Sequence, residues 1–416
     1  MPDVLVIGGG AAGMAAAVFA ARAGASVLLL EKNEKLGKKV YITGKGRCNL
    51  TNDCDLDEFL SQVPRNPRFL YSALNFLAPR DMMSLLEEAG CPVEVQRGRR
   101  VFPRSEKASD VTRALTACLR SAGVKIRLDT EVTALEQSGG RISAVRLAGG
   151  ERIPADAFVL CTGGLSYPST GSTGDGYRFA ADAGHTVLPP RPVLVGLETA
   201  ENWPRALQGL SLRNVTLTLS REKKELYSEL GEMLFTHFGI SGPLVLEASC
   251  HLPDPPAGTS IAIDLKPGLT AEQLNARLLR DFAAAGKKLL RSELGTLLPA
   301  RLAEMFPERC GLPAALPCSQ VTSAQRQRLV ETLKSLPLTV RAPRPLDEAV
   351  VTRGGIDVRE IDPATMRSKR IPNLFFAGEL IDVDAHTGGF NLQIAWSTGA
   401  LAGKSSVEEN RLLTDS

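Results

Sequence analysis

The two ends of the chain consist of short apolar runs separated by glycine-rich turns. Residues 4–7 are four apolar residues in a row, which is the pattern of a strand buried on both faces of a parallel sheet. The alanine-rich segment 14–23 predicts a helix that ends at Gly24, and a second apolar run follows at 26–30. The order strand, helix, strand predicts a βαβ unit at the start of the chain.

The turn between the first strand and the helix carries a G-x-G-x-x-G pattern at Gly8, Gly10 and Gly13. In a βαβ unit the first glycine makes the tight turn, the second lets the backbone approach a pyrophosphate, and the third lets the helix pack closely on the strand. Glu31 follows eighteen residues after the last of these glycines. A carboxylate there accepts hydrogen bonds from ribose hydroxyls and repels a 2′-phosphate, so these residues predict a site for FAD or NAD rather than NADP.

A second segment with glycines and an acid lies near the C-terminus. Residues 373–379 indicate a buried strand that ends at Gly378 and Glu379, and a glycine-rich turn at 387–389 leads into a helix predicted over 394–402. The positive end of that helix would face the flavin and stabilise its anionic reduced form. NAD-dependent dehydrogenases have no need of such a segment, so the pattern favours FAD.

Two proline-rich stretches, 189–192 and 342–345, bracket the middle of the chain. Proline pairs form stiff connectors that mark domain boundaries. Because both flanks have to reach the same cofactor, we expect a discontinuous FAD-binding domain of residues 1–190 and 345–416. The inserted domain is then 191–344.

The elements expected elsewhere follow from the same periodicities. The insertion is β-rich because apolar and polar residues alternate in it, apart from a helical part at about 270–336. Helices are predicted over 57–62, 67–76, 80–89, 110–122, 177–183, 271–284, 287–298 and 324–336. Strands are predicted over 124–128, 131–136, 142–147, 157–161, 193–198, 210–220, 224–230, 232–235 and 260–265. The sequence has no second G-x-G-x-x-G after a strand, so NAD(P)H would bind only transiently, or electrons would come from another donor.

Composition and charge exclude several classes of protein. The 416 residues suffice for two or three domains at roughly 150 residues each, and 44% apolar with 23% charged residues is ordinary for a globular protein. A net charge of +3 gives no whole-chain reason to expect nucleic-acid or membrane binding. The eight cysteines form no CxxC pair or Cys/His cluster, which predicts no metal site and free thiols in a cytoplasmic protein. Glycines interrupt the apolar stretch 4–30, and Asp3 precedes it, so neither a signal peptide nor a membrane span is expected.

The most specific motif is Thr-Gly-Lys-Gly-Arg-Cys-Asn-Leu-Thr-Asn at 43–52. Further segments that match the same family are 98–103, 162–164, 167–176, 236–243 and 377–396. Along nearly its whole length the chain resembles the BaiN/RdsA (YhiN-like) family of NAD(P)/FAD-dependent oxidoreductases. The resemblance implies an α/β fold: a split Rossmann-like FAD-binding domain with an inserted β-rich, barrel-like domain and a small helical subdomain. It also implies two kinds of substrate, an enone-type small molecule and a uracil ring of ribosomal RNA. Ala385 and His386 depart from the glycine-led turn expected at their position.

These segments supply the residues expected to bind the cofactor. The first glycine turn and the acid after it contribute, and the resemblance adds the 43–52 block, one strand start, one strand end and the C-terminal glycine segment. The candidates are Gly8, Gly10, Ala11, Ala12, Gly13, Glu31, Lys32, Gly37, Lys38, Thr43, Gly44, Arg47, Cys48, Asn49, Val132, Thr162, Gly163, Gly164, Gly378, Glu379, Asp382, Gly388, Gly389, Phe390, Asn391 and Leu392.

Two histidines are candidate catalytic proton donors. His237 lies in a block with glycines and a proline, and His386 precedes the predicted flavin helix; for both, a structural histidine is the competing interpretation. Cys48 and Cys54 have five residues between them, where disulfide reductases have four. A redox disulfide is therefore not expected, and Cys48 is interpreted as a small buried group.

Two polar clusters are candidate contacts for substrate or phosphate. The residues are Arg99, Arg100, Arg104, Ser172 and Thr173. The arginines belong to a basic stretch that also contains Arg97 and Lys107, and a phosphate-rich substrate would use it, although solvated charge is the simpler explanation. The serine and threonine lie in a glycine-rich loop whose N–H groups would hold an anion, with a plain helix cap as the alternative.

These patterns lead to the expectation of a FAD-dependent reductase. Hydride would pass from NAD(P)H to flavin N5 and then to a polarised double bond, with a side chain or water supplying the proton. The basic stretch favours ribosomal RNA, with dihydrouridine as the product, over an enone-type small molecule. An amine oxidase, and a non-catalytic flavin-binding protein that associates with RNA or senses redox state, stay open as alternatives. The oligomeric state stays open as well.

Overall fold

The computed structural model describes residues 1–414, with side chains described as far as residue 408. The chain divides into two compact units, Met1–Val193 with Pro345–Ser416, and Leu194–Arg344. Each unit is built around its own apolar core. The first is a Rossmann-like α/β unit and the second contains a β-barrel, so the predicted fold class is confirmed.

A five-stranded parallel sheet forms the centre of the first unit. Its strands, in spatial order, are β19 (Leu374–Phe376), β10 (Ala157–Leu160), β1 (Val4–Ile7), β2 (Val27–Leu30) and β6 (Lys125–Arg127). β1 is buried along its whole length between β10 and β2, as a continuous apolar run in a parallel sheet has to be. The carboxyl ends of β1, β2 and β10 therefore lie together at one edge, where ligands bind in open α/β sheets.

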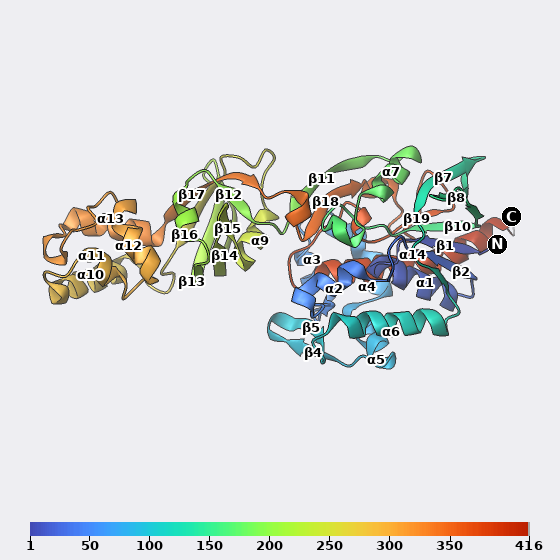
Figure 1. Cartoon of the computed structure of the whole chain (residues 1–416), viewed down its shortest axis with the longest axis horizontal. Helices are drawn as coiled ribbons and strands as arrows, with labels where there is room; N and C mark the ends of the chain where they lie inside the picture. Colours follow the sequence, from blue (N-terminus) through green and yellow to red (C-terminus); the bar gives the residue numbers. More distant parts are fainter. Residues whose placement is uncertain (415–416) are drawn as a thin grey trace. The chain divides into compact units, whose positions relative to one another are not determined.

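Helices α1 (Ala11–Arg22) and α14 (Phe390–Thr414) lie side by side in this unit (Figure 1). The predicted helix 394–402 is too short at both ends. Its start was missed because the side chain of Asn391 closes the preceding loop from inside the first turn. At the other end Gly403 lies within the helix and does not end it. The residue is a glycine because a Cβ there would come 2.1 Å from the carbonyl oxygen of Ala16 in α1.

Further elements of the first unit surround this core. Its other α-helices are α2 (Lys38–Ile42), α3 (Leu56–Ser61), α4 (Tyr71–Phe76), α5 (Pro79–Glu88), α6 (Ala108–Ser121) and α7 (Asp175–Asp182). Its smaller sheets combine β3 (Thr51–Asn52), β5 (Arg100–Pro103) and β4 (Val93–Gln96); β7 (Val132–Ser138), β8 (Arg141–Leu147) and β9 (Arg152–Pro154); and β11 (Val187–Val193) with β18 (Val351–Ile356).

Two features of these smaller sheets were not expected. The hairpin β4–β5 follows a region of helical periodicity and has a mixed pattern of exposure, so periodicity gave no signal for it. The proline stretch 189–192 is part of strand β11 instead of a connector, and the strand predicted over 193–198 is wrong in its bounds. Within the described residues β11 pairs with β18 alone, and a register shift after Leu188 accommodates prolines that cannot donate to a ladder.

The second unit is a closed six-stranded antiparallel barrel with a group of helices. The strands, in spatial order, are β12 (Leu197–Thr199), β15 (Gly239–Ser241), β14 (Lys224–Phe235), β13 (Ser211–Arg221), β16 (Ser260–Asp264) and β17 (Leu336–Pro343). Its helices are α8 (Trp203–Ala206), α9 (Pro243–Ser249), α10 (Ala271–Ala285), α11 (Leu290–Leu294), α12 (Ala300–Arg309) and α13 (Ser323–Lys334). Figure 1 shows α10 to α13 grouped together beside the barrel strands.

The helix predicted over 287–298 shrinks to the five residues of α11. A longer helix, α12, follows directly and was not predicted. Pro299 precedes it and Pro307 lies inside it, and proline in a sequence argues against a helix. The two strands predicted at 224–230 and 232–235 are one long strand, β14, with Gly231 in its interior.

Candidate functional site

The turn between β1 and α1 leaves an open space beside the start of the helix. Gly8 has a φ of 102°, and a Cβ at Gly13 would lie 1.8 Å from the Gly8 carbonyl oxygen, so neither position accepts a side chain. At Gly10 the opposite holds: φ is −78°, and a Cβ there would meet nothing within 4 Å. The N–H groups in the first turn of α1 have no intrahelical acceptors, which makes this space suited to a phosphate.

Glu31 is fixed at the end of β2 by backbone and side-chain donors. Its Oε2 accepts the N–H of Gly9 at 2.7 Å, and its Oε1 accepts the backbone N–H of Asn33 at 2.8 Å and the side-chain amide at 2.6 Å. A carboxylate has about four lone-pair sites, so one or more stay available to ribose hydroxyls. The role predicted for this acid, accepting from ribose hydroxyls, stays a prediction.

The block at 43–52 packs against the glycine turn that begins α14. The amide nitrogen of Asn52 donates to the Gly388 carbonyl oxygen at 3.1 Å, across 336 positions of sequence. The Asn49 amide accepts the Gly389 N–H at 3.0 Å and donates to the Thr51 carbonyl oxygen at 3.2 Å. A Cβ at Gly389 would lie 2.3 Å from the Thr51 carbonyl oxygen, so the approach requires glycine.

Helices α1 and α14 run parallel, with backbone in direct contact. A Cβ at Gly399 would lie 2.2 Å from the Ala12 carbonyl oxygen, and one at Gly403 would lie 2.1 Å from that of Ala16. Since residues four apart in one helix meet residues four apart in the other, the two N-termini point the same way. At about 1.5 Å per residue, the start of α14 extends roughly 12 Å beyond the start of α1. An elongated ligand can therefore meet both helix N-termini.

Gly378 lies against the first turn of α1, and the side chain of Glu379 belongs to a polar cluster. A Cβ at Gly378, whose φ is 78°, would lie 2.8 Å from the Ala12 Cβ. The carboxylate of Glu379 pairs with Lys39 at 2.6 Å and accepts the hydroxyl of Ser166 at 2.8 Å. Glu379 is thus held within the protein, and its neighbouring backbone is what faces α1.

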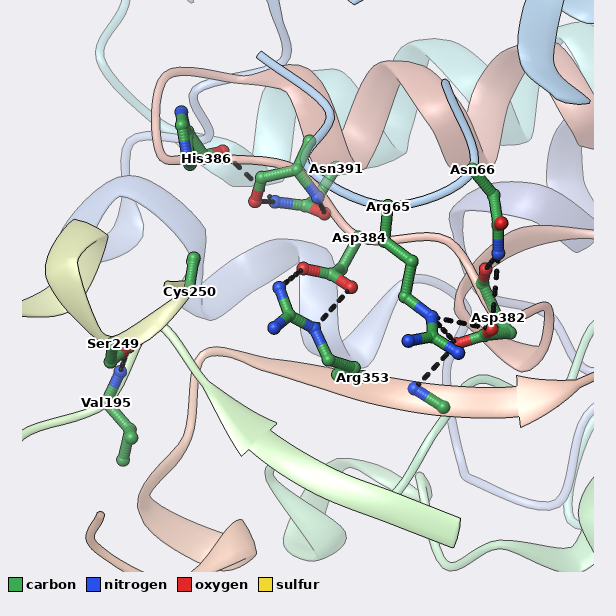
Figure 2. A network of polar contacts seen from close by, with 12 residues as sticks. Arg65, Asn66, Val195, Ser249, Cys250, Arg353, Asp382, Asp384, His386 and Asn391 are labelled. Atoms are coloured by element: carbon green, nitrogen blue, oxygen red, sulfur yellow. Dashed lines mark hydrogen bonds and ion pairs between the residues drawn. The ribbon is translucent and has the colours of Figure 1, made fainter. Parts of the chain in front are cut away.

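Two buried carboxylates hold the segment between Glu379 and α14 (Figure 2). Asp382 is 1% exposed and accepts Arg65 Nε at 2.7 and 2.9 Å, together with the Gly354 N–H at 3.1 Å. Asp384 is fully buried and accepts Arg353 Nη2 at 2.6 Å and Nε at 2.9 Å. Asp382, predicted to bind cofactor, is therefore saturated by protein donors and shapes the segment.

The loop that carries His386 is closed by Asn391, as Figure 2 shows. The Asn391 amide donates to the Ala385 carbonyl oxygen at 2.7 Å and to that of His386 at 3.2 Å. The His386 ring is half-buried, with Nδ1 3.2 Å from Gln62 Oε1. His386 thus lies four residues before the start of α14. His237 belongs to the other unit, where its exposed ring lies edge-on to Phe238 at 5.0 Å, and its role stays a prediction.

Lys32 and Arg47, both predicted cofactor ligands, are engaged by carboxylates. Lys32 pairs with Asp175 at 2.6 Å and donates to the Thr173 hydroxyl at 2.5 Å, so the loop before α7 is neutralised internally. Arg47 pairs with Glu106 at 2.9 Å. These side chains hold neighbouring loops in position.

The other predicted cofactor ligands divide by their surroundings. Lys38 pairs with Glu34 at 3.1 Å, and the Thr43 hydroxyl donates to the Val40 carbonyl oxygen at 2.7 Å. Val132 is buried at the start of β7, and the buried hydroxyl of Thr162 has no hydrogen-bond partner within the described residues. The remaining predicted cofactor positions also belong to the first unit. They are Ala11, Gly37, Gly44, Gly163, Gly164, Phe390 and Leu392.

Cys48 does not have the properties of a reactive thiol. It is fully buried, and burial raises its pKa to about 12 despite a hydrogen bond with Thr43. All eight cysteines are buried, and none of them forms a disulfide within the described residues. Among residues 1–414 no three His, Cys, Asp or Glu side chains gather as a metal would require, and no helix there is long and apolar enough to cross a bilayer.

Of the predicted phosphate contacts, Arg99 pairs with Glu58, and Ser172 is buried. Arg100 and Arg104 are exposed. Side chains that the sequence did not single out are Lys39, Arg65 and Arg353, because their partners come from distant segments. One signal was available: residues 380–385 alternate two aspartates with apolar residues, and buried aspartates need cations.

A parallel sheet, the open glycine turn with its acid, and a second glycine turn on a parallel helix define a Rossmann-type FAD-binding flavoprotein. Solved structures agree on the fold: quinol-fumarate reductase (TM-score 0.54, 17% identity, 99% of this chain and 72% of that one) and a flavocytochrome c3 fumarate reductase (TM-score 0.50, 18% identity, 98% and 78%).

The family model for the HI0933-like protein Rossmann domain matches residues 2–405. The chain belongs to this HI0933-like (BaiN/RdsA) family of FAD-dependent oxidoreductases, which confirms the predicted resemblance. It is 33% identical to a 3-dehydro-bile acid delta(4,6)-reductase of Clostridium scindens over 415 residues, covering 98% of this chain and 100% of the relative. It is also 33% identical to a ribosomal RNA dihydrouridine synthase of Haemophilus influenzae over 399 residues, covering 95% and 96%.

Proposed function

We propose that this protein is a FAD-dependent reductase that uses NAD(P)H to reduce a C=C bond, and that its substrate is a uracil ring of ribosomal RNA, giving dihydrouridine. The observation that carries the proposal is the parallel pair α1 and α14, whose N-termini lie at the two glycine turns. Relatives over nearly the whole chain are named for this reaction and for a bile-acid reductase. The coarse chemistry, reduction of a C=C bond, is common to both.

The residues of the first unit fit FAD, because the space beside Gly10 is open and α1 presents unpaired N–H groups there. When bound, FAD supplies two-electron transfer between a nicotinamide and a polarised double bond. The first turn of α1 would hold the pyrophosphate of FAD, and Glu31 would accept hydrogen bonds from the ribose hydroxyls. The positive N-terminal end of α14, after Gly389, favours negative charge beside it.

A proton must reach the substrate carbon that does not receive hydride. His386 is the side chain of the first unit that we assign to this step, because it is half-buried and precedes α14. The Oε1 of Gln62 lies 3.2 Å from its Nδ1. His237, from the second unit, is the alternative donor, and comparing His386→Gln with His237→Gln turnover decides between them.

Gly10→Glu tests the proposal, with Gly10→Ala as its matched control. Both side chains fit the backbone, since φ is −78° and the space is open, but only glutamate places a negative charge where a pyrophosphate is expected. We expect the wild type and Gly10→Ala to purify yellow with FAD near 1:1 and to be bleached anaerobically by NADH or NADPH. Gly10→Glu should be colourless. A wild type that takes up no FAD would contradict the proposal.

The substrate is decided in a deletion strain whose ribosomal RNA lacks dihydrouridine. The wild-type chain should restore the modified base, as measured by mass spectrometry of nucleosides, and Gly10→Glu should not. Bleaching by NAD(P)H without restoration would favour an enone-type small molecule. A flavin that is reduced by amines and reoxidised by oxygen would indicate an amine oxidase instead, and a flavin that no donor reduces would indicate a non-catalytic protein.

A further inference from the structure

The hairpin β4–β5 and the residues that follow it carry several exposed basic side chains. Its two strands are joined by a tip at Arg97–Arg99, where Gly98 and Arg99 both have positive φ. Residues 94–107 contain five basic and two acidic side chains.

Neither of the two acids neutralises the basic side chains of the hairpin strands. Glu94 accepts the amide of Gln96 at 2.6 Å, and Glu106 pairs with Arg47, which lies outside the hairpin, at 2.9 Å. Both carboxylates are therefore engaged by other partners.

Arg99 is not available to bind an external anion, because it pairs with Glu58. Four side chains are exposed and form no ion pair or side-chain hydrogen bond within the described part of the chain: Arg97, Arg100, Arg104 and Lys107. Unpaired exposed cations can neutralise the phosphates of a polyanion and displace the counterions condensed on it.

A single buried amide joins this hairpin to the turn that begins α14. Asn52, in β3, pairs with Arg100 in the sheet. Its amide nitrogen donates to the Gly98 carbonyl oxygen at the hairpin tip and to the Gly388 carbonyl oxygen before α14, each at 3.1 Å. A partner bound on the hairpin is thus held beside the predicted flavin turn.

We infer that the β4–β5 hairpin is the surface on which this protein docks the phosphate backbone of RNA. The inference rests on the proposed function and names the docking surface for that substrate. From Arg100 to Arg104 the chain extends about 13 Å at strand rise, so the basic side chains are spread along the hairpin instead of meeting at one point.

The test compares two triple variants that remove equal charge. Arg97→Gln, Arg100→Gln and Arg104→Gln together empty the hairpin; Arg120→Gln, Lys125→Gln and Arg309→Gln remove three exposed arginine and lysine charges elsewhere. Affinity for a fluorescent oligouridine of about 20 nucleotides is titrated from low salt to 1 M. At ~0.7 counterions per phosphate contact, the hairpin variant should lose about two units of slope in log K against log salt, and about 100-fold in affinity at 0.1 M salt. The control variant should keep the wild-type slope.

Melting temperature and FAD content establish that both variants are folded. Equal losses in the two triple variants, or a wild-type slope in the hairpin variant, would overturn the inference. Full restoration of dihydrouridine in the deletion strain by the hairpin variant would also overturn it, while leaving the reductase function standing. Failure of the wild-type chain to restore dihydrouridine would instead contradict the proposed substrate, and the oligouridine titration would still decide the hairpin.

Discussion

Replacing Gly399 by alanine tests whether the contact between α14 and α1 sets the position of their two N-termini. A Cβ there would lie 2.2 Å from the Ala12 carbonyl oxygen and 2.9 Å from the Ala12 Cα. These are backbone atoms, so no side chain can rotate away. Unstrained contacts need about 3.5 Å, and the helices would have to separate by roughly 1 Å.

The expected cost to stability is modest, whereas the cost to function is large. Overpacking costs about 1–3 kcal/mol, and alanine regains about 1 kcal/mol as the better helix former, so the free energy of unfolding should fall by about 0–2 kcal/mol. A displacement of about 1 Å between groups that position reactants costs on the order of 100-fold in rate. Gly399→Ala should therefore stay folded but reduce its flavin slowly.

The assay is the rate of anaerobic flavin bleaching by NAD(P)H, together with FAD affinity and melting temperature. Gly149→Ala is the matched control, because a Cβ at that position would meet nothing within 4 Å. We expect wild-type behaviour from the control. A Gly399→Ala protein with wild-type FAD affinity and bleaching rate would refute the reasoning that this contact positions the cofactor.

Three further predictions concern buried or paired groups. Arg353→Met leaves the fully buried carboxylate of Asp384 without its cation and should lower the free energy of unfolding, measured in urea, by about 3–5 kcal/mol. Adding Asp384→Leu should recover most of that loss. Equal losses in the single and the double variant would contradict the pairing. Because burial raises the pKa of Cys48 to about 12, iodoacetamide at pH 8 should modify it only in denaturant, and labelling of the native protein would contradict its burial. A hydrogen bond from Arg370 lowers the pKa of Glu360 from 4.5 to about 2. The stabilisation by Glu360 is therefore complete above about pH 4.5 and is lost as the pH falls toward about 2, so the stability difference from Glu360→Gln should shrink over that range, and a growing difference would count against the pair.

The parts of the fold that the sequence predicted are those in which the signal is local. The strand at 4–7, the turn at Gly8–Gly13 and the helix after it each follow from a few adjacent residues, and the structure contains all three. Glu31 was found because its distance along the chain from the glycines is fixed by the length of a helix and a strand.

The parts that escaped prediction depend on distant partners. Gly403 has the character of a helix end, and only the closeness of Ala16 explains why α14 continues through it. The ion pair of Arg353 with Asp384 joins residues 31 positions apart on separate elements, and no periodicity reports it. The hairpin β4–β5 is held by its pairing with β3, which sequence periodicity does not encode.

The motif at 43–52 identifies the family without identifying the substrate, and its contacts explain why. Asn49 and Asn52 direct their amides at the backbone of Gly388 and Gly389, and burial raises the pKa of the Cys48 thiol. The Asn52 amide nitrogen donates two hydrogen bonds, which a carboxylate, having no donor, and a hydroxyl, having one, cannot replace. The motif therefore specifies how β3 meets the start of α14. Substrate choice must come from residues that these contacts leave exposed, and the unpaired cations of the hairpin are of that kind.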